Sequence, residues 1–406
     1  MNLRLTHRSL RLAVTAFVFI TANASFAGEP IKVFILAGQS NMVGHARAHT
    51  IATLLASEKE RDQKLLQQVM NHEETEISRA TLEEQLKRGR KLDQLTGGIS
   101  NSKIKEMEDG PEKVALEAQV KELKDAHEAY KKKIASACVE SDRVYISSIA
   151  DGNKRSGKLG IGYGAAVDKI GPEYGFGLSI AEKIDGPILL IKTSWGGKSL
   201  HYNFRPPSAG AYELNEKEQA DEKADEISEN AGLNYRMMND AVENVLANLG
   251  DHHPAYDPEA GFEIAGFVWF QGFNDQFSPE FHGNYKNNMI SFINDIRDEY
   301  EAPQLPFVIG VLGTGVTAEK VGENQVSIAQ REAAETMGTD NHVAAVESYL
   351  EYSLYSNTVF QKGWPEHFHE WDTVGSDRPY HYLGSGAFFI RLGDAFANSM
   401  SDLINP

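Results

Sequence analysis

A serine at the end of an apolar segment is the residue of this chain best placed to do chemistry. Residues 31–37 read IKVFILA, and Gly38, Gln39, Ser40 and Asn41 follow directly. A buried strand that ends in Gly-x-Ser places a hydroxyl at the carboxyl edge of a sheet, where open α/β folds bind their ligands. We therefore predict that Ser40 is a nucleophile.

A second segment contains glycines that could stabilise negative charge on a reacting carbonyl oxygen. Residues 189–200 read LLIKTSWGGKSL. Glycines directly after a strand let backbone N–H groups approach a ligand closely, as an oxyanion requires. Gly197, or its neighbour Gly196, is the candidate donor. A phosphate-binding loop ending at Lys198 fits poorly, because Lys192 stands where that motif needs a glycine.

A third segment offers side-chain amides for the same purpose. Residues 264–270 form an apolar run, and QGFND follows it. The amide of Gln271 or of Asn274 could donate to the oxyanion. The alternative is a loop in which Asn274 and Asp275 hydrogen-bond only to nearby backbone.

A histidine near the C-terminus could activate the serine. Residues 374–386 read VGSDRPYHYLGSG, in which Asp377 precedes His381 by four residues, and Asp372 lies further upstream. A serine hydroxyl needs a base, and an acid orients that base. These residues predict acyl transfer by a Ser-His-Asp site. A structural histidine bonded to backbone is the alternative.

Alternating apolar and helical patterns predict the elements that position these segments. We expect helices at residues 176–184, 235–249, 283–300, 324–337 and 385–400. We expect strands at residues 31–37, 144–149, 187–193, 264–270, 305–312 and 342–346. Strands that alternate with crossover helices form parallel sheets. The predicted fold is therefore α/β, a flavodoxin-like, doubly wound parallel sheet.

Residues 48–137 interrupt this pattern with a predicted helical insertion. Apolar or aromatic side chains recur at steps of four and three, typical of a helix packed on a partner helix, at Leu116, Val120, Leu123, His127, Tyr130 and Ile134. Thr96, Gly97 and Gly98 could end the first helix. We predict a coiled-coil-like helical hairpin that is a solvated decoration, because charges at helical spacing usually form a solvent-exposed face. A lid, or an arm for homo-oligomerisation, is the alternative.

The N-terminus reads as a targeting segment. Arg4, Arg8 and Arg11 precede the apolar residues 12–20, and Ser25 and Ala27 offer a cleavage point. This run is too short to span a bilayer. We predict a signal peptide at residues 1–27, a mature catalytic domain at residues 28–406, and a periplasmic or secreted protein.

Charge and cysteine content exclude several classes of function. Formal net charge is -18, and removing three arginines gives -18 - 3 = -21. Such a chain would be repelled by nucleic acid and by anionic membrane surfaces. The single Cys138 cannot form an internal disulfide. Two histidine pairs lack further metal ligands at useful spacing, so we predict neither metal nor cofactor: His45 with His49, and His367 with His369.

Four blocks in this order resemble the SGNH hydrolase superfamily: GQSN, SWGG, QGFND and a late histidine before the last helix. The closest branch is that of sialate O-acetylesterases and family-six carbohydrate esterases, which includes acetylxylan esterases. The resemblance covers most of the chain from residue 31 onward, without the insertion. It implies Ser40 as nucleophile and oxyanion donor, with Gly197 or Gly196 as a second donor. The third donor is Asn274, or Gln271 in the carbohydrate esterase branch.

The fourth block departs from the superfamily pattern. That pattern is Asp-x-x-His, but Arg378 stands three residues before His381. Asp377 is one position further back, and Asp372 and Glu366 are weaker substitutes. A Ser-His dyad without an acid is the remaining alternative.

The resemblance implies an exported esterase that removes acetyl or other short acyl groups from carbohydrate. Its partner would be an acetylated poly- or oligosaccharide. Four side chains near the blocks could bind that substrate: Trp195, Lys198, Arg205 and Trp371. A lipase or thioesterase on the same fold, and a catalytically silent carbohydrate-binding protein, are the alternatives.

Overall fold

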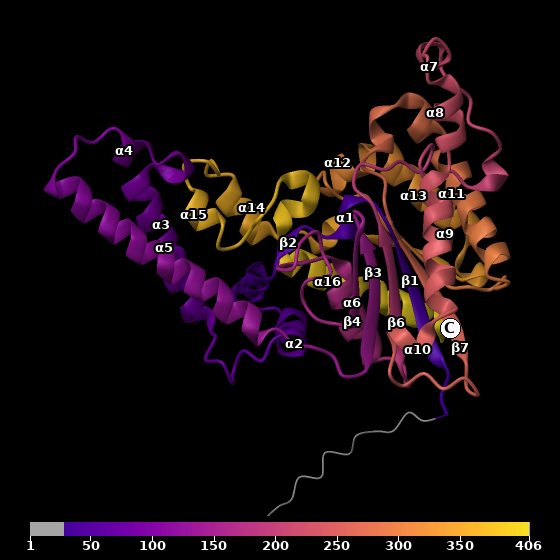
Figure 1. The fold of residues 1–406 in the computed structure, drawn as a ribbon, viewed down its shortest axis with the longest axis horizontal. Helices are drawn as coiled ribbons and strands as arrows, with labels where there is room; N and C mark the ends of the chain where they lie inside the picture. Colours follow the sequence, from indigo (N-terminus) through magenta and orange to yellow (C-terminus); the bar gives the residue numbers. More distant parts are fainter. Residues whose placement is uncertain (1–27, 406) are drawn as a thin grey trace, which may run out of the picture.

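A seven-stranded sheet forms the centre of the molecule (Figure 1). The computed structural model describes residues 28–405, so the predicted signal peptide lies outside the described residues. The strand order is β4-β3-β6-β1-β7-β8-β9, and only β4 is antiparallel to its neighbour. The strands are β1 (Ile31–Gly38), β3 (Val144–Ala150), β4 (Asn153–Lys158), β6 (Ile188–Ser194), β7 (Phe262–Phe270), β8 (Phe307–Val311) and β9 (Val343–Glu347).

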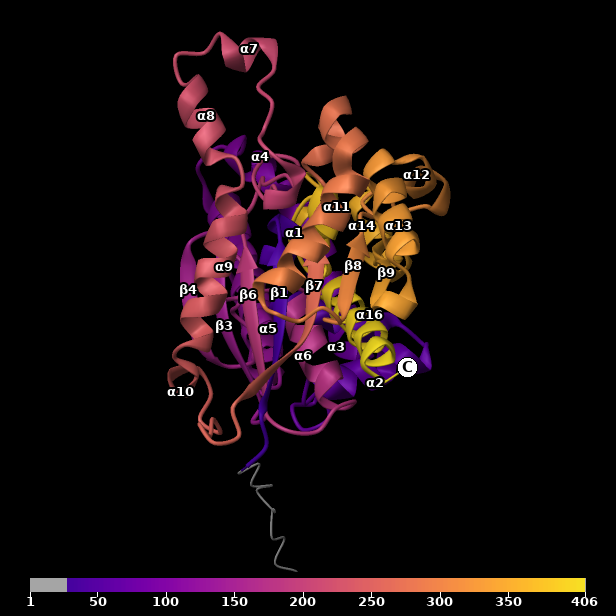
Figure 2. The ribbon, with the colours of Figure 1, turned by 90° about the vertical axis from the view of Figure 1, so that its right-hand side faces the viewer.

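Helices cover both faces of the sheet. Figure 2 looks onto the face covered by α9 (Leu233–Leu246), α11 (Pro279–Glu299) and α13 (Gln325–Met337). The other face carries α6 (Pro172–Ala181) and α16 (Gly386–Ile404). Side chains of β1 alternate between the two cores, as a doubly buried strand requires: Val33 and Ile35 join one, and Phe34 and Leu36 the other.

The order of five strands is that of the flavodoxin-like fold. Taken along the chain, β1, β6, β7, β8 and β9 stand in the order 2-1-3-4-5. The predicted fold class is therefore confirmed. The chain crosses to opposite sides of β1, so the ends of β1, β6 and β7 meet at the switch point. One difference is β4, which the sequence did not predict and which extends the sheet through an antiparallel hairpin with β3.

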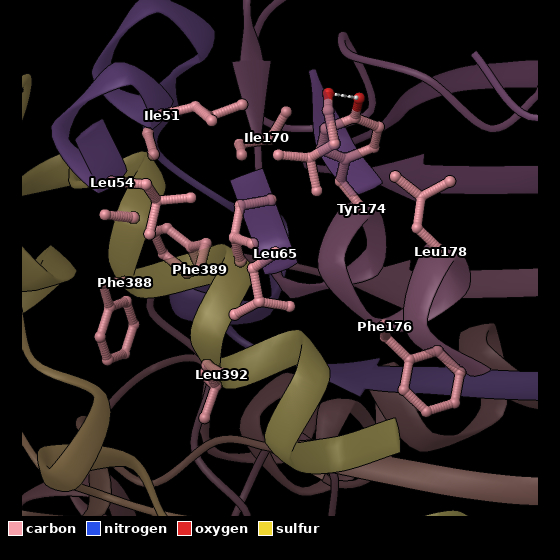
Figure 3. Packing of buried hydrophobic residues seen from close by; sticks show 14 of the residues in the cluster. Ile51, Leu54, Leu65, Ile170, Tyr174, Phe176, Leu178, Phe388, Phe389 and Leu392 are labelled. Carbon is pink, nitrogen blue, oxygen red and sulfur yellow. Dashed lines mark hydrogen bonds between the residues drawn. The ribbon is translucent and has the colours of Figure 1, made fainter. Parts of the chain in front are cut away.

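The insertion has a base and an arm. Its elements are η1 (Ala48–Ala56), α2 (Glu60–Val69), α3 (Arg79–Thr96), η2 (Gly98–Ser100), α4 (Ser102–Lys105) and α5 (Pro111–Ala137). Figure 3 shows Ile51, Leu54 and Leu65 of the base packed with Phe389 and Leu392 of α16. In contrast, α3 and α5 extend away from the sheet (Figure 1). The base is therefore part of the main core. Homo-oligomerisation through the arm stays a prediction.

Buried polar contacts join the insertion to the segment that precedes the histidine block. The Asp372 carboxylate lies 2.8 Å from His127 Nε2 and 2.6 Å from Lys131 Nζ. Asp93 lies 2.8 Å from His369 Nδ1. Asp372 is therefore committed to α5, and the suggestion that it could orient His381 does not fit this geometry.

Short elements connect these parts. A small sheet pairs β2 (Ala46–Arg47) with β5 (Lys169–Ile170). Two short helices, α7 (Glu216–Gln219) and α8 (Ala224–Asn230), project beyond α9 (Figures 1 and 2). The short helices are α1 (Ser40–Val43), α7 (Glu216–Gln219), α8 (Ala224–Asn230), α10 (Leu249–His252), α12 (Ala318–Glu323), α14 (Leu354–Phe360) and α15 (Phe368–Trp371). The 3-10 turns are η3 (Pro207–Ala209), η4 (Asp275–Phe277), η5 (Thr339–Asn341), η6 (Ser348–Glu351) and η7 (Pro379–Gly384).

Within residues 28–405, every helix is too short or too polar to cross a lipid bilayer.

A fully buried ion pair contacts α1, the short helix that begins with the predicted nucleophile Ser40. Lys192 Nζ donates to Glu173 Oε2 at 2.7 Å, to the Val43 carbonyl at 2.8 Å and to the Tyr163 carbonyl at 2.9 Å. Both side chains are completely buried. All three ammonium hydrogens therefore have acceptors. One acceptor is the carbonyl of Val43, the last residue of α1, the helix that begins with Ser40.

Replacing Lys192 with methionine is expected to lower the free energy of unfolding by about 3 to 5 kcal/mol, because Glu173 would keep a buried, uncompensated charge. Urea denaturation measures this. The exposed pair of Lys158 and Asp142 provides a control, for which Lys158→Met should change stability much less than Lys192→Met does. Adding Glu173→Leu to Lys192→Met should recover part of the loss. Equal effects of the two lysine substitutions would contradict a structural role for the buried pair.

Candidate active site

Gln39 ties the end of β1 to the end of β7 and so places Ser40. Its side-chain oxygen accepts from Gly272 N at 3.2 Å, Asn274 N at 3.3 Å and Gln271 Nε2 at 3.1 Å. Its backbone N–H donates to the Phe270 carbonyl at 3.3 Å. Ser40 is the next residue and the first of α1. The first and third predicted blocks are thus held together by one buried glutamine.

The loop after β6 lies against the same serine. A Cβ built on Gly196 would lie 3.8 Å from Ser40 Cβ. The Gly196 N–H donates to Asp151 Oδ1 at 2.6 Å. Among residues 28–405, neither the Gly197 N–H nor the Ser40 N–H has a hydrogen-bond acceptor. Of the two glycines, Gly197 is therefore the one with a free donor.

The two candidate amides differ in what they already bind. Gln271 is 3% exposed, and its Nε2 donates to Gln39 Oε1, to the Lys198 carbonyl and to Asp275 Oδ2. Asn274 is half-buried, and within the described part of the chain its Nδ2 donates to one acceptor, the Gly197 carbonyl, at 2.7 Å. Because an amide nitrogen carries two hydrogens, Asn274 keeps one for a ligand, whereas both hydrogens of Gln271 are committed.

The histidine block lies against the start of α1, although among residues 28–405 no hydrogen bond joins His381 to Ser40 Oγ. His381 Nδ1 lies 3.1 Å from Asp377 Oδ1, although four residues separate the pair in sequence. The turn η7 bends there, with left-handed backbone at Tyr382. Asn41 Nδ2 donates to the Tyr380 carbonyl at 3.2 Å, which joins this block to the residue after Ser40. Arg378 lies instead over the Trp364 ring, 3.8 Å from its centroid.

Asp377 also holds a second imidazole. His45 Nδ1 lies 3.4 Å from Asp377 Oδ2, and its ring stacks on that of His381 with centroids 3.9 Å apart. Lys169 Nζ lies 3.7 Å from the same oxygen. Burial raises the pKa of Asp377, but hydrogen bonds from His381 and His45 outweigh burial and hold it well below its usual range. Burial lowers the pKa of His45, against the effect of Asp377. The carboxylate is thus ionised at neutral pH.

The histidine pairs considered in the sequence differ from the grouping in the structure. The sequence paired His45 with His49 and found no further metal ligands, but His49 Nε2 bonds to the Asp372 carbonyl. In the structure, ligand atoms of His45, Asp377 and His381 lie within 4.8 Å of one another. The three side chains are close enough to share a cation. Any such cation would compete with the hydrogen bonds that His381 and His45 make to Asp377.

Comparison with known proteins places the chain in a family. Residues 96–352, more than half of the chain, match the family described as carbohydrate esterase, sialic acid-specific acetylesterase. The chain belongs to this family. The resemblance seen in the sequence is therefore confirmed. The matched range of the sialic acid-specific acetylesterase family contains Gly197 and Asn274. Ser40 lies before it, and Asp377 and His381 lie after it.

Two solved structures are similar to this family member at low identity. A protein of Arabidopsis thaliana has 16% identity and a TM-score of 0.37, over 79% of this chain and 86% of its own. A carbohydrate acetylesterase of Xanthomonas citri has 13% identity and a TM-score of 0.38, over 78% of this chain and 49% of its own. No curated protein matches the sequence.

The four predicted substrate-binding residues of this family member have different surroundings. Trp371 is 4% exposed and packs in the core against Trp364 and Phe360, so a sugar-binding role for it does not fit. Arg205 donates to the carbonyls of His201, Ala209, Gly210 and Ala211, which makes it an organiser of its own loop. Trp195 is 7% exposed, and Lys198 is half-buried beside Gly197. Trp195 and Arg205 line surface pockets, and Lys198 directly follows the candidate oxyanion donor Gly197.

The sequence missed two residues beside the site, His45 and Asp151. His45 had been considered only as a metal ligand. Asp151 occupies the Asp-Gly turn between β3 and β4, with left-handed backbone at both Asp151 and Gly152. An Asp-Gly pair is the strongest short-range signal for a two-residue hairpin. That signal could have predicted both β4 and the carboxylate beside Gly196.

Asp275 holds the second and third blocks together from a buried position. Its carboxylate accepts from Leu200 N at 3.0 Å and from His201 N at 3.0 Å, as well as from Gln271. Burial raises its pKa to about 6, although these hydrogen bonds lower it. A carboxyl group with a raised pKa stabilises the fold below the unfolded value of 3.8, and that contribution is lost as pH rises through about 6.

Asp275→Asn should therefore remove a pH dependence of stability. Between about pH 4 and pH 7, the difference in free energy of unfolding between variant and wild type should move in the variant's favour by roughly 2 to 3 kcal/mol. Urea denaturation at the two pH values measures this difference. The same difference at both values would show that Asp275 does not titrate as its burial indicates.

Proposed function

We propose that this protein is a serine esterase that removes acetyl groups from carbohydrate. The observation that carries the proposal is the hydrogen bond between Asp377 and His381, on a loop that Asn41 ties to the nucleophile helix. Membership of the acetylesterase family supports the reaction class. The free donors at the switch point support the site: the N–H groups of Ser40 and Gly197 and the amide of Asn274.

In the proposed mechanism, Ser40 Oγ attacks the carbonyl carbon of the ester while His381 takes the hydroxyl proton. Asp377 orients the imidazole and stabilises its charged form. The negative oxygen of the tetrahedral intermediate accepts hydrogen bonds from the three donors. When the intermediate collapses, the bond to the sugar oxygen breaks, and that oxygen takes the proton from His381. A water molecule then adds to the acyl carbon, gives its proton to His381, and acetate leaves as Ser40 regains a proton.

Acetate release from a panel of acetylated xylan, acetylated pectin and O-acetylated sialic acid tests the proposal. We expect release from at least one member of the panel. Release from none of them would contradict a carbohydrate substrate. Turnover of p-nitrophenyl palmitate in preference to p-nitrophenyl acetate would indicate the rival lipase function. Saccharide binding without turnover would indicate a silent binding protein.

Asn274→Ala is expected to lower kcat by about 100- to 1,000-fold, the effect of removing one oxyanion donor. Removing the amide of Gln271 should act differently, because that side chain binds Gln39, Lys198 and Asp275. Gln271→Ala should mainly lower thermal stability. Steady-state kinetics with p-nitrophenyl acetate and thermal unfolding of both variants measure the two effects. A larger fall in kcat for a folded Gln271→Ala protein would reverse the assignment.

We further propose export to the periplasm or the cell exterior, on the charge and apolar pattern of residues 1–27. Acetylated polysaccharides outside the cell would then be the substrate class. Edman sequencing of the mature protein would test the cleavage point, with Gly28 as the expected first residue.

A further inference from the structure

Three aromatic rings form a strip at the surface beside His381. Tyr380 is 44% exposed, and its ring centroid lies 4.5 Å from that of His381. Phe273 is half-buried, with its ring centroid 5.8 Å from that of Tyr380. Phe277 is 70% exposed and lies 5.2 Å from Phe273. We call these three side chains the aromatic strip. Exposed apolar surface that gathers at one place marks a binding site.

The backbone under the aromatic strip is held in place. The Tyr380 carbonyl accepts from Asn41. The backbone N–H groups on both sides of Phe273 donate to Gln39. Phe277 ends η4, which begins at the buried Asp275. Rings on a fixed backbone can bind a ligand with little loss of conformational entropy.

The position of the aromatic strip decides which part of an ester it would meet. In acyl transfer the histidine gives its proton to the leaving oxygen, so groups beside His381 lie against the leaving alcohol. At the loop after β6, the groups near Ser40 are instead polar, namely Gly196 and the Asp151 carboxylate. The exposed apolar surface thus lies where the leaving alcohol would be. The charged carboxylate of Asp151 lies instead near the loop after β6.

We propose that the aromatic strip is the binding site for the pyranose ring of the leaving sugar. This inference rests on the function proposed above and assigns the residues that recognise its substrate. A pyranose ring presents faces of C–H groups, whose partial positive charge complements the negative face of an aromatic ring. Phe277 and Tyr380 offer the exposed faces, and Phe273 supports both. The aromatic strip, and not Trp371 as the sequence predicted, would therefore bind the sugar.

Calorimetric titration of a Ser40→Ala protein, in which cleavage is expected to be lost, tests the inference by binding alone. The probes are acetylated xylobiose and O-acetylated N-acetylneuraminic acid. Adding Phe277→Ala should weaken binding of whichever probe is bound by about tenfold, which corresponds to about 1.4 kcal/mol. Phe262→Ala is the matched control, because Phe262 is 42% exposed but begins β7, at the opposite end of the strand from the site. It should leave binding at the Ser40→Ala value.

A second measurement separates this inference from the proposed function. In proteins that keep Ser40, Phe277→Ala should lower kcat/KM for the acetylated sugar relative to that for ethyl acetate, whose leaving group has no ring. The inference is overturned if Phe277→Ala binds both probes as tightly as its parent, if the parent binds neither probe, or if the two kcat/KM values fall in the same proportion. Binding that depends on Phe277 without acetate release would uphold the aromatic strip and reject the esterase function.

Discussion

Ser40→Ala is expected to lower acetate release by roughly a million-fold, the effect seen when a serine nucleophile is removed from a working triad. The serine hydroxyl supplies the oxygen that forms the acyl-enzyme, so its removal stops the first chemical step. Within residues 28–405, Ser40 Oγ makes no hydrogen bond that the fold would lose. The thermal unfolding of the variant should therefore match that of wild type.

The control for this substitution is Ser148→Ala. Ser148 is buried in β3, and its hydroxyl has no hydrogen-bond partner among the described residues. Both variants thus remove one unpaired hydroxyl, but only one of them should change turnover. Steady-state kinetics with p-nitrophenyl acetate compares them. More than about a tenth of wild-type activity in a folded Ser40→Ala protein would reject the nucleophile assignment.

Asp377→Asn is expected to lower kcat by about 10,000-fold, because the amide cannot hold the imidazole in the tautomer that accepts the serine proton. The variant also removes the negative charge that His45 and Lys169 share. Because the pKa of Asp377 is lowered in the folded protein, ionised Asp377 stabilises the fold at pH values above the usual carboxyl pKa. This stabilisation is lost as the pH falls through the lowered pKa.

Asp372→Asn is the matched comparison, since the sequence offered both acids as partners of His381. Asp372 binds His127 and Lys131 of the insertion, which hold its pKa below the usual range in spite of burial. We expect this variant to lose thermal stability and to keep its kcat. A larger fall in kcat for Asp372→Asn than for Asp377→Asn would reverse the two roles. If neither substitution changes kcat, His381 acts without an acid.

The central strands could be predicted because each is buried on both faces. The runs that became β1, β6 and β7 are nearly continuous in apolar residues, and the reactive segments follow them directly. The edge strand β4 reads NKRSGK and is largely exposed, so no burial pattern announces it. Its only signal was the Asp-Gly turn that precedes it.

The surroundings of single side chains were harder to predict, because tertiary contacts decide them. Trp371 and Arg205 are of types that often bind sugars, but packing and backbone carbonyls occupy them in this fold. Asp377 stands outside the expected spacing, and only the bend at η7 brings it to His381. His45 reaches the same carboxylate because Gly44 approaches Gly171 so closely that a Cβ there would lie 2.2 Å from Gly171 Cα. Sequence spacing does not reveal such an approach.

The most direct test is to trap the acyl-enzyme. The protein is mixed with an acetylated saccharide that it turns over, quenched in acid within the first turnover, digested, and analysed by mass spectrometry. The account predicts an acetyl group on the peptide that contains Ser40, and its absence from the same peptide of Ser40→Ala. Acetate release without any acetylated peptide, or with the acetyl group on another residue, would contradict it.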